Sequence, residues 1–141
     1  MYPHRIRLRG PWDYEPLART VTSDEPLPLK GRVTMPARED EGGLANFAGR
    51  VRFRRRFGWP ARIDVHERVW LTFAGVEAVA DVWLNGQSLG RHEGSGPCEF
   101  DVTALLQIRN ELTVEVEAAS GSGLSGEVAL EVRDTACDPQ V

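Results

Sequence analysis

The sequence predicts an all-β protein, a single antiparallel β-sandwich of about eight or nine strands. First, its dominant hydrophobic period is two residues rather than 3.6, as in strands that bury one face. Second, 9 prolines and 14 glycines are spread among short alternating segments, so turns are frequent. Third, 141 residues with 41% hydrophobic content make one domain, residues 1–141, large enough to bury a core.

Alternation of apolar and polar residues identifies the individual strands. In segment 111–117, Leu112, Val114 and Val116 share one face, while glutamates and a threonine share the other. Four further segments alternate in the same way, namely 51–57, 69–73, 79–84 and 127–133.

Turn signals and weaker patterns complete the expected elements. Asn85-Gly86 predicts a type I′ hairpin between 79–84 and 87–92, because both residues tolerate a positive φ. Ile6 alternates with arginines near the N-terminus, and segment 29–36 reads as a short strand. The best helical candidate is one turn at 103–106, where Thr103 is a candidate cap.

The charge is unevenly distributed, yet it does not favour nucleic acid as a partner. Residues 1–68 carry 14 basic and 9 acidic side chains, whereas 69–141 carry 3 and 12, for a net charge of −4. The basic residues of 50–56 mostly alternate with apolar ones, which is typical of a solvated strand face. The pI near 5.4 also opposes phosphate binding.

Other compositional signals set the expected environment. The longest apolar runs are four residues or fewer, so no membrane partner is expected. The first residues lack the apolar stretch of a signal peptide, so the chain as given is expected to be cytoplasmic; removal of a leader would make it secreted. Cys98 and Cys137 lie in different settings, so a reduced pair is the simpler interpretation and one disulfide the alternative.

Consecutive motifs within 45–117 are more specific than periodicity. They include Phe53-Arg54-Arg55-Arg56-Phe57, Val82-Trp83-Leu84-Asn85-Gly86, Phe100-Asp101-Val102-Thr103 and Asn110-Glu111-Leu112. In this order they resemble the N-terminal sugar-binding domain of family 2 glycoside hydrolases, which include β-galactosidases, β-glucuronidases and β-mannosidases. The resemblance implies a galactose-binding-like jelly roll, with carbohydrate as the partner and without the catalytic barrel. The high arginine count beside a single lysine suggests a GC-rich bacterial genome.

The loop at 92–98 departs from the family pattern. Ser95 replaces the usual second glycine, the aromatic residue is missing, and Cys98 stands where phenylalanine is usual. In the full enzymes this loop approaches the catalytic domain, so that contact is in doubt here. Glycoside hydrolysis needs two carboxylates about 5–9 Å apart, one of them with a raised pKa. Glu93 and Glu99 are the best pair available, and no motif surrounds them, so the chain is predicted not to be an enzyme.

A sugar site needs an aromatic platform and convergent polar groups. Trp70 and Trp83 have outward parity, and the alternative is that neighbouring strands or loops cover them. Arg55 shares parity with apolar neighbours and would need a carboxylate such as Asp81 or Asp101, unless a bulge turns it outward. In the 92–98 loop, His92 and Glu93 are candidate ligand contacts, with loop-anchoring hydrogen bonds as the alternative for His92.

A structural calcium ion is a further expectation that comes from the resemblance. Glu39, Asp40 and Glu41 offer suitable oxygen ligands, and a solvated acidic loop is the alternative. No other cofactor is expected. Two functions follow: a non-catalytic carbohydrate-binding module, or a structural or protein-interaction domain of the same fold that has lost sugar binding and docks on a partner chain.

Overall fold

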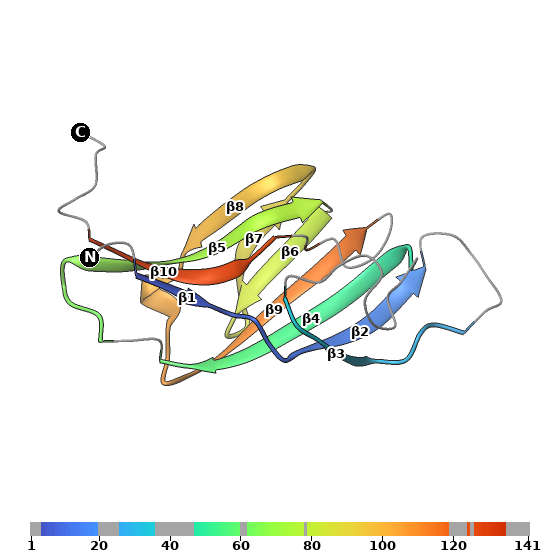
Figure 1. Ribbon diagram of the computed structural model, residues 1–141, viewed down its shortest axis with the longest axis horizontal. Helices are drawn as coiled ribbons and strands as arrows, with labels where there is room; N and C mark the ends of the chain where they lie inside the picture. The colour runs from blue at the N-terminus through green and yellow to red at the C-terminus, as the bar shows by residue number, and fades with distance from the viewer. Residues whose placement is uncertain are drawn as a thin grey trace.

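The computed structural model describes residues 4–19, 26–35, 47–59, 62–77, 79–118, 124 and 126–134. These residues form ten strands in two antiparallel sheets (Figure 1). One sheet has the order β1-β10-β5-β8 and the other β3-β2-β4-β9-β6-β7. The strands are β1 (His4–Arg7), β2 (Trp12–Arg19), β3 (Gly31–Val33), β4 (Gly49–Gly58), β5 (Glu67–Glu77), β6 (Val79–Leu84), β7 (Gln87–His92), β8 (Ser95–Asp101), β9 (Arg109–Ala118) and β10 (Val128–Asp134).

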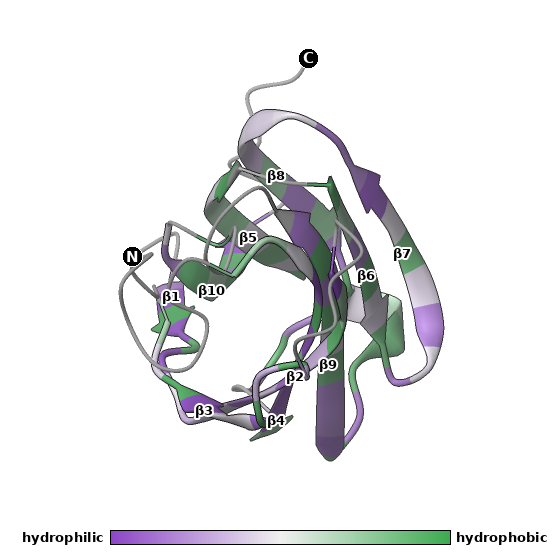
Figure 2. Cartoon of the chain, turned by 90° about the vertical axis from the view of Figure 1, so that its right-hand side faces the viewer, coloured by the Kyte–Doolittle hydropathy of each residue, from purple (hydrophilic) through white to green (hydrophobic). Residues whose placement is uncertain are grey.

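The two sheets enclose one hydrophobic core, and Figure 2, which looks along the long axis, shows them curving around this interior. The inward residues of the alternating segments fill it, so the predicted parity is confirmed. Trp12, Phe53 and Phe73 are the largest fully buried side chains. Burying each such side chain contributes roughly 1.5–3 kcal/mol. The Trp12 indole donates to the Leu8 carbonyl oxygen over 2.7 Å, which satisfies its only polar group.

The strands expected from the sequence are present, and two more appear. Strand β2 was missed although Trp12 and Tyr14 alternate with Asp13 and Glu15, because Pro16 interrupts the pattern. The pairing register of β2 with β4 shifts just after Pro16, which accommodates the proline. Strand β8 was missed because its glycine and proline read as a loop. Among the described residues, no helical segment has the length and the apolar composition needed to span a membrane.

The Asn85-Gly86 hairpin is confirmed, since both residues have positive φ, 53° and 83°. The Asn85 side chain also holds the turn to the β8–β9 connection. Its amide donates to Asn110 Oδ1 and to the Leu105 carbonyl, each over 3.0 Å, and its oxygen accepts from the Glu111 N–H at 2.9 Å. Asn85 and Asn110, the two asparagines of the family motifs, therefore stabilise this turn through hydrogen bonds.

The helical turn at 103–106 is a short 3₁₀ helix, η2 (Thr103–Leu105), and Thr103 is not its cap. Instead, Asp101 Oδ1 accepts hydrogen bonds from the Thr103 N–H at 3.0 Å and from its hydroxyl at 2.7 Å. The Thr103 hydroxyl in turn accepts from the Val69 N–H at 2.8 Å. This small network fixes the end of β8 against β5.

Candidate functional site

The outer face of the six-stranded sheet carries ordered columns of charge. Arginines of β4 face outward between carboxylates of β9 and β2. Glu115 binds two of them, Arg50 at 2.8 Å and Arg52 at 3.1 Å. Arg56 pairs with Glu111 at 3.2 Å. The arginine-rich segment is therefore a strand face whose cations are largely neutralised within the sheet, as the alternation predicts.

One row of this face breaks the pattern. On β9, Thr113 stands between Glu111 and Glu115, directly opposite Arg54 of β4. The pairing register aligns six outward residues across the sheet, which we call the Trp83 row: Arg32, Asp13, Arg54, Thr113, Trp83 and Ser88.

Arg54 has no ion pair with any residue that the structure describes. The carboxylate beside it in the row is that of Asp13, which pairs with Arg32 at 3.3 Å. Thr113 on the other side carries no charge. Arg54 is exposed, so its guanidinium faces solvent in a row that lacks the glutamate found in both neighbouring rows.

A groove opens at the β2–β3–β4 end of the Trp83 row. Its volume is about 400 Å³. Charged side chains dominate its walls, four basic and two acidic: Lys30, Arg32, Arg52, Arg54, Asp13 and Glu15. We call this the basic groove.

Trp83 lies two strands from Arg54 in the same row, about 10 Å away at the usual strand spacing. It is half-buried on the outer face of β6, between Thr113 and Ser88. No cation–π or ring contact joins it to another described residue. Of the two predicted outward tryptophans, Trp83 is therefore the half-buried one on whose ring no described cation or aromatic side chain stacks.

Trp70 lies on the outer face of the other sheet and is covered. The Arg133 guanidinium carbon sits 4.9 Å from the centre of the Trp70 ring. Arg133 is held there by Glu99 at 2.7 Å and by Glu131 at 2.9 Å. The alternative of a covered ring applies to Trp70, because an ion-paired side chain occupies the place of a stacked sugar.

Glu131 is the centre of this second network. It is buried and accepts hydrogen bonds from Arg133 and from Arg5, whose closest contact is 2.6 Å. Partial burial by itself raises the pKa of Glu131, but the hydrogen bonds and charges of the two arginines outweigh it and hold the pKa below its ordinary value. The glutamate therefore stays ionised and pins both arginines.

The expectation of a carboxylate partner for Arg55 is wrong. Its Nε is buried without a hydrogen-bond partner, and its terminal nitrogen donates to the Arg56 carbonyl. Asp81 binds Arg50 at 3.3 Å, and Asp101 binds Arg68 at 2.7 Å. Both aspartates lie on outer faces, whereas Arg55 has inward parity, so neither is placed to reach it.

His92 and Glu93, the two candidates from the 92–98 loop, differ in burial and in partners. His92 is half-buried opposite Ala80, and its Nε2 makes no hydrogen bond within the described part of the chain. Glu93 is exposed and pairs with Arg91 at 3.2 Å. The structure does not bring Trp70, Trp83, Arg55, His92 and Glu93 into one site. The two tryptophans lie on the outer faces of different sheets, Arg55 is a partly exposed residue of β4, and His92 and Glu93 lie at the end of β7.

The carboxylate pair considered for catalysis is also divided. Glu93 follows β7 in one sheet and Glu99 lies on β8 in the other. Each is ion-paired with its own arginine. Both carboxylates are exposed to solvent. Cys98 carries a free thiol whose pKa is raised by burial, and Cys137 lies outside the described residues.

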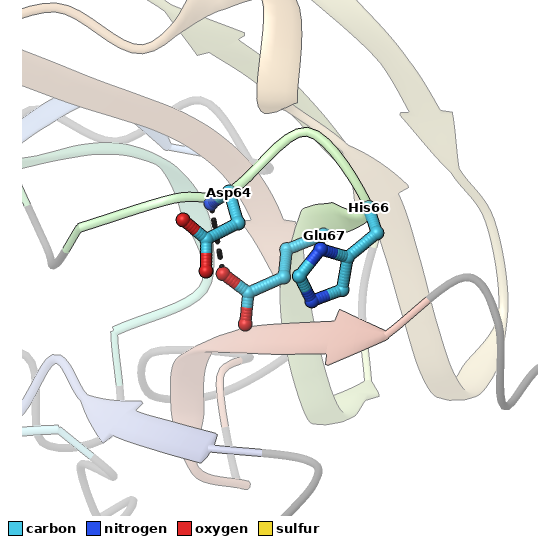
Figure 3. Close-up of side chains that lie close together, drawn as sticks. All are labelled: Asp64, His66 and Glu67. Atoms are coloured by element: carbon cyan, nitrogen blue, oxygen red, sulfur yellow. Dashed lines mark hydrogen bonds between the residues drawn. The ribbon is translucent and has the colours of Figure 1, made fainter.

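One cluster of metal-ligating types was not foreseen. Asp64, His66 and Glu67 have donor atoms within 4.8 Å of one another (Figure 3). The Asp64 N–H donates to a Glu67 carboxylate oxygen over 2.8 Å, which closes the turn without an ion. The adjacent cavity of about 490 Å³ is also lined by Arg5 and Arg62, and these cations oppose a bound metal. The expected calcium ligands Glu39, Asp40 and Glu41 lie outside the described residues.

The sequence predicts Trp83 as a candidate ligand contact, and it does not reveal the groove at the other end of the same row. The signal was present: Thr113 interrupts the glutamates of β9 opposite the arginines of β4. Its meaning depends on the register between β4 and β9, which the sequence does not show. Lys30 and Arg32 lie in or next to β3, a strand of only three residues, which is too short to show an alternating pattern.

Comparison with known proteins agrees with this architecture. Residues 39–137 match the family model for the glycosyl hydrolase 2 galactose-binding domain-like fold. A β-galactosidase of Priestia megaterium is 43% identical over 58 residues, covering 40% of this chain and 6% of that protein. A β-glucuronidase of Formosa agariphila is 31% identical over 84 residues, covering 59% and 8%.

Solved structures give the same result over a longer stretch. A Bifidobacterium dentium β-glucuronidase complexed with coumarin-3-O-glucuronide has a TM-score of 0.73 and 26% identity, covering 94% of this chain and 31% of that one. A putative β-galactosidase of Bacteroides fragilis has a TM-score of 0.72 and 20% identity, covering 95% and 24%. The chain thus spans about a third or less of these relatives. It belongs to the galactose-binding-like domain family of glycosyl hydrolase 2.

Proposed function

We propose that this chain is a non-catalytic carbohydrate-binding module that binds through the Trp83 row. Trp83 is the platform on which a pyranose ring stacks. Thr113 and Arg54 supply hydrogen bonds to sugar hydroxyls on one side, and Ser88 supplies them on the other. The observation that carries the proposal is the alignment of a half-buried tryptophan, on which no described cation stacks, with Thr113, Ser88 and the unpaired Arg54 in one row of a sheet face.

The chemistry of the row suits an oligosaccharide lying across the strands. An aromatic ring with a few well-placed polar groups is the general requirement for such sites. The other outer face supports the proposal by contrast, because there Arg133 already occupies the tryptophan. The relatives are β-galactosidases and β-glucuronidases, so galactosides and glucuronides are the first ligands to test.

The test is thermal unfolding of the chain with mono- and oligosaccharides at about 10 mM. A ligand with Kd near 1 mM would stabilise the protein by about 1.4 kcal/mol. For a chain of 141 residues this raises the Tm by about 3–5 °C. Trp83→Ala should abolish the shift, whereas the matched control Trp70→Ala should keep it. No shift with any sugar, or a shift that survives Trp83→Ala, would overturn the proposal.

A structural or docking domain is the second candidate, and a different surface favours it. Trp59 and Ile108 are 47% and 81% exposed. They lie side by side where β4 ends and β9 begins, since the Trp59 N–H donates to the Ile108 carbonyl over 3.0 Å. An apolar pair of this kind suits contact with another domain. Sedimentation velocity would then detect association, with itself or with a family 2 catalytic barrel, that Trp59→Ser weakens while all sugars remain without effect.

A further inference from the structure

We infer that the basic groove selects acidic carbohydrate, with the anionic group of the ligand, a uronate carboxylate or a sulfate ester, bound between Arg54 and Lys30. This rests on the proposed function and names the ligand class for the same row. The sugar ring on Trp83 would orient the chain, and the groove would receive the acidic residue that follows it across the sheet.

The charge balance of the groove is the first argument. Four cations face two carboxylates along its walls. Asp13 is engaged by Arg32, and Glu15 lies 3.5 Å from Arg52, which also binds Glu115. After these pairs are counted, Arg54 and Lys30 have no ion pair with any described residue. Two cations therefore remain available to a ligand.

The register of the sheet explains why they remain available. Arg52 and Arg56, the neighbours of Arg54 on the outer face of β4, each have a glutamate of β9 beside them. At Arg54 that position is Thr113, whose hydroxyl donates a hydrogen bond to an anion but does not neutralise the arginine. A planar guanidinium binds a carboxylate or a sulfate through two parallel N–H bonds.

The surroundings favour an acidic glycan over other polyanions. The whole chain has a net charge of −4, which opposes the binding of a long polyanion over its surface. A nucleic acid would need a longer basic track and several aromatic platforms for its bases. The Trp83 row offers one tryptophan, about 10 Å from one groove. That arrangement matches one stacked sugar and one neighbouring anionic group.

The experiment is isothermal titration of the full chain with a tetragalacturonate and with its methyl ester, which has the same sugar backbone without the charge. The free acid should bind roughly tenfold more tightly at 50 mM salt, as expected for two exposed ionic contacts. This preference should shrink as salt is raised, because the Debye length falls from about 10 Å at 0.1 M toward 3 Å at 1 M. A sulfated galacto-oligosaccharide against its unsulfated form distinguishes the two anion sources.

Variants localise the effect. Lys30→Gln should remove most of the preference for the acid while leaving the binding of the methyl ester unchanged, because Lys30 lies outside the Trp83 row. Arg54→Gln should also remove most of the preference, and it should weaken the binding of the ester much less than that of the acid, because the glutamine amide still donates to a sugar hydroxyl. Arg56→Gln is the matched control, because it lies on the same strand face but pairs with Glu111 outside the groove. Equal Tm values would establish that all three variants fold.

Each outcome decides a different point. Equal binding of the ester and the acid, and of both galacto-oligosaccharides, overturns the inference while the carbohydrate module stands. Loss of the preference in Arg56→Gln but not in Arg54→Gln also overturns it, since the anion would then bind elsewhere. Absence of binding by any sugar refutes the proposed function itself. Binding of a single-stranded oligonucleotide as tight as that of the acid would assign the groove to nucleic acid instead.

Discussion

The Glu131 network provides the sharpest quantitative prediction. Glu131 lies on β10, with a side chain only 9% exposed, and it bridges Arg5 of β1 to Arg133 of the same strand. Four guanidinium hydrogen bonds reach its two oxygens, at 2.6 Å and 3.1 Å from Arg5 and at 2.9 Å and 3.1 Å from Arg133. Glu131→Gln keeps the shape but removes the charge and replaces one acceptor oxygen with an NH₂ donor.

The size of the effect follows from this geometry. About two of the charge-assisted bonds are lost, and such bonds contribute roughly 1.5–3 kcal/mol each when shielded from water. Arg5 is 51% exposed and Arg133 is 32% exposed, so solvent screening reduces the value toward the lower end. We expect Glu131→Gln to lower the free energy of unfolding by about 2–3 kcal/mol. For this chain length the Tm falls by about 7–10 °C.

The same network predicts how the effect depends on pH. The pKa of Glu131 in the folded state is held below its ordinary value of 4.5. A carboxyl with a lowered folded pKa stabilises the protein above the unfolded pKa, and this stabilisation is lost as the pH falls through the folded pKa. The difference between the original chain and Glu131→Gln is therefore full at pH 7 and shrinks below pH 4.5.

Urea unfolding at pH 7, 4 and 3, followed by tryptophan fluorescence, measures both effects. Glu111→Gln is the control, because its pair with Arg56 is exposed and contributes at most about 1 kcal/mol. A loss below about 0.5 kcal/mol at pH 7, or one that is unchanged at pH 3, would refute the reasoning.

Three further predictions concern buried polar and backbone features. Asn110→Ala removes one of the two acceptors of Asn85 Nδ2 and leaves the Gln107 N–H and carbonyl without the Asn110 side chain, so we expect a loss of about 2–3 kcal/mol in urea unfolding. Gly126→Ala should destabilise the protein more than Gly86→Ala, because the new Cβ at position 126 would lie 2.2 Å from the Gly75 nitrogen. A Cβ at position 86 would meet open space, so that substitution costs only about 1 kcal/mol through the positive φ of Gly86. Differential scanning calorimetry ranks the two variants, and equal Tm values would contradict this expectation. In a Cys137→Ser background, the Cys98 thiol should react with a disulfide reagent at pH 8 more slowly than free cysteine until denaturant is added, because burial raises its pKa.

The sequence alone specified much of the fold, for a local reason. Period-two alternation depends only on which residues share a strand face, so Val51 and Phe53 or Leu112 and Val114 reveal their strands without knowledge of the partner. Asn85-Gly86 likewise fixes a hairpin through its own backbone preferences. Where local preference was ambiguous, prediction failed. Strands β2 and β8 contain prolines or glycines, and only pairing with β4 and β5 makes them strands.

The candidate site divides in the same way. Parity showed that Trp70 and Trp83 point outward, but it did not show what lies above each ring. Arg133 covers Trp70 because the order β10-β5-β8 brings Glu131 and Glu99 to either side of it. The sequence suggested a carboxylate partner for Arg55, but the parity of residues within one strand does not show how far a side chain lies from residues of other strands.

The sequence by itself therefore determined the fold class, most strands, the family motifs and the inward or outward parity of each side chain. Only the tertiary structure decided which outward side chains of different strands lie next to one another. The register between β4 and β9 sets Thr113 beside Arg54, and the order of β9 and β6 places Trp83 in the same row. Parity is a property of one strand, whereas a binding surface depends on long-range pairing between strands, which alternation along one chain segment does not encode.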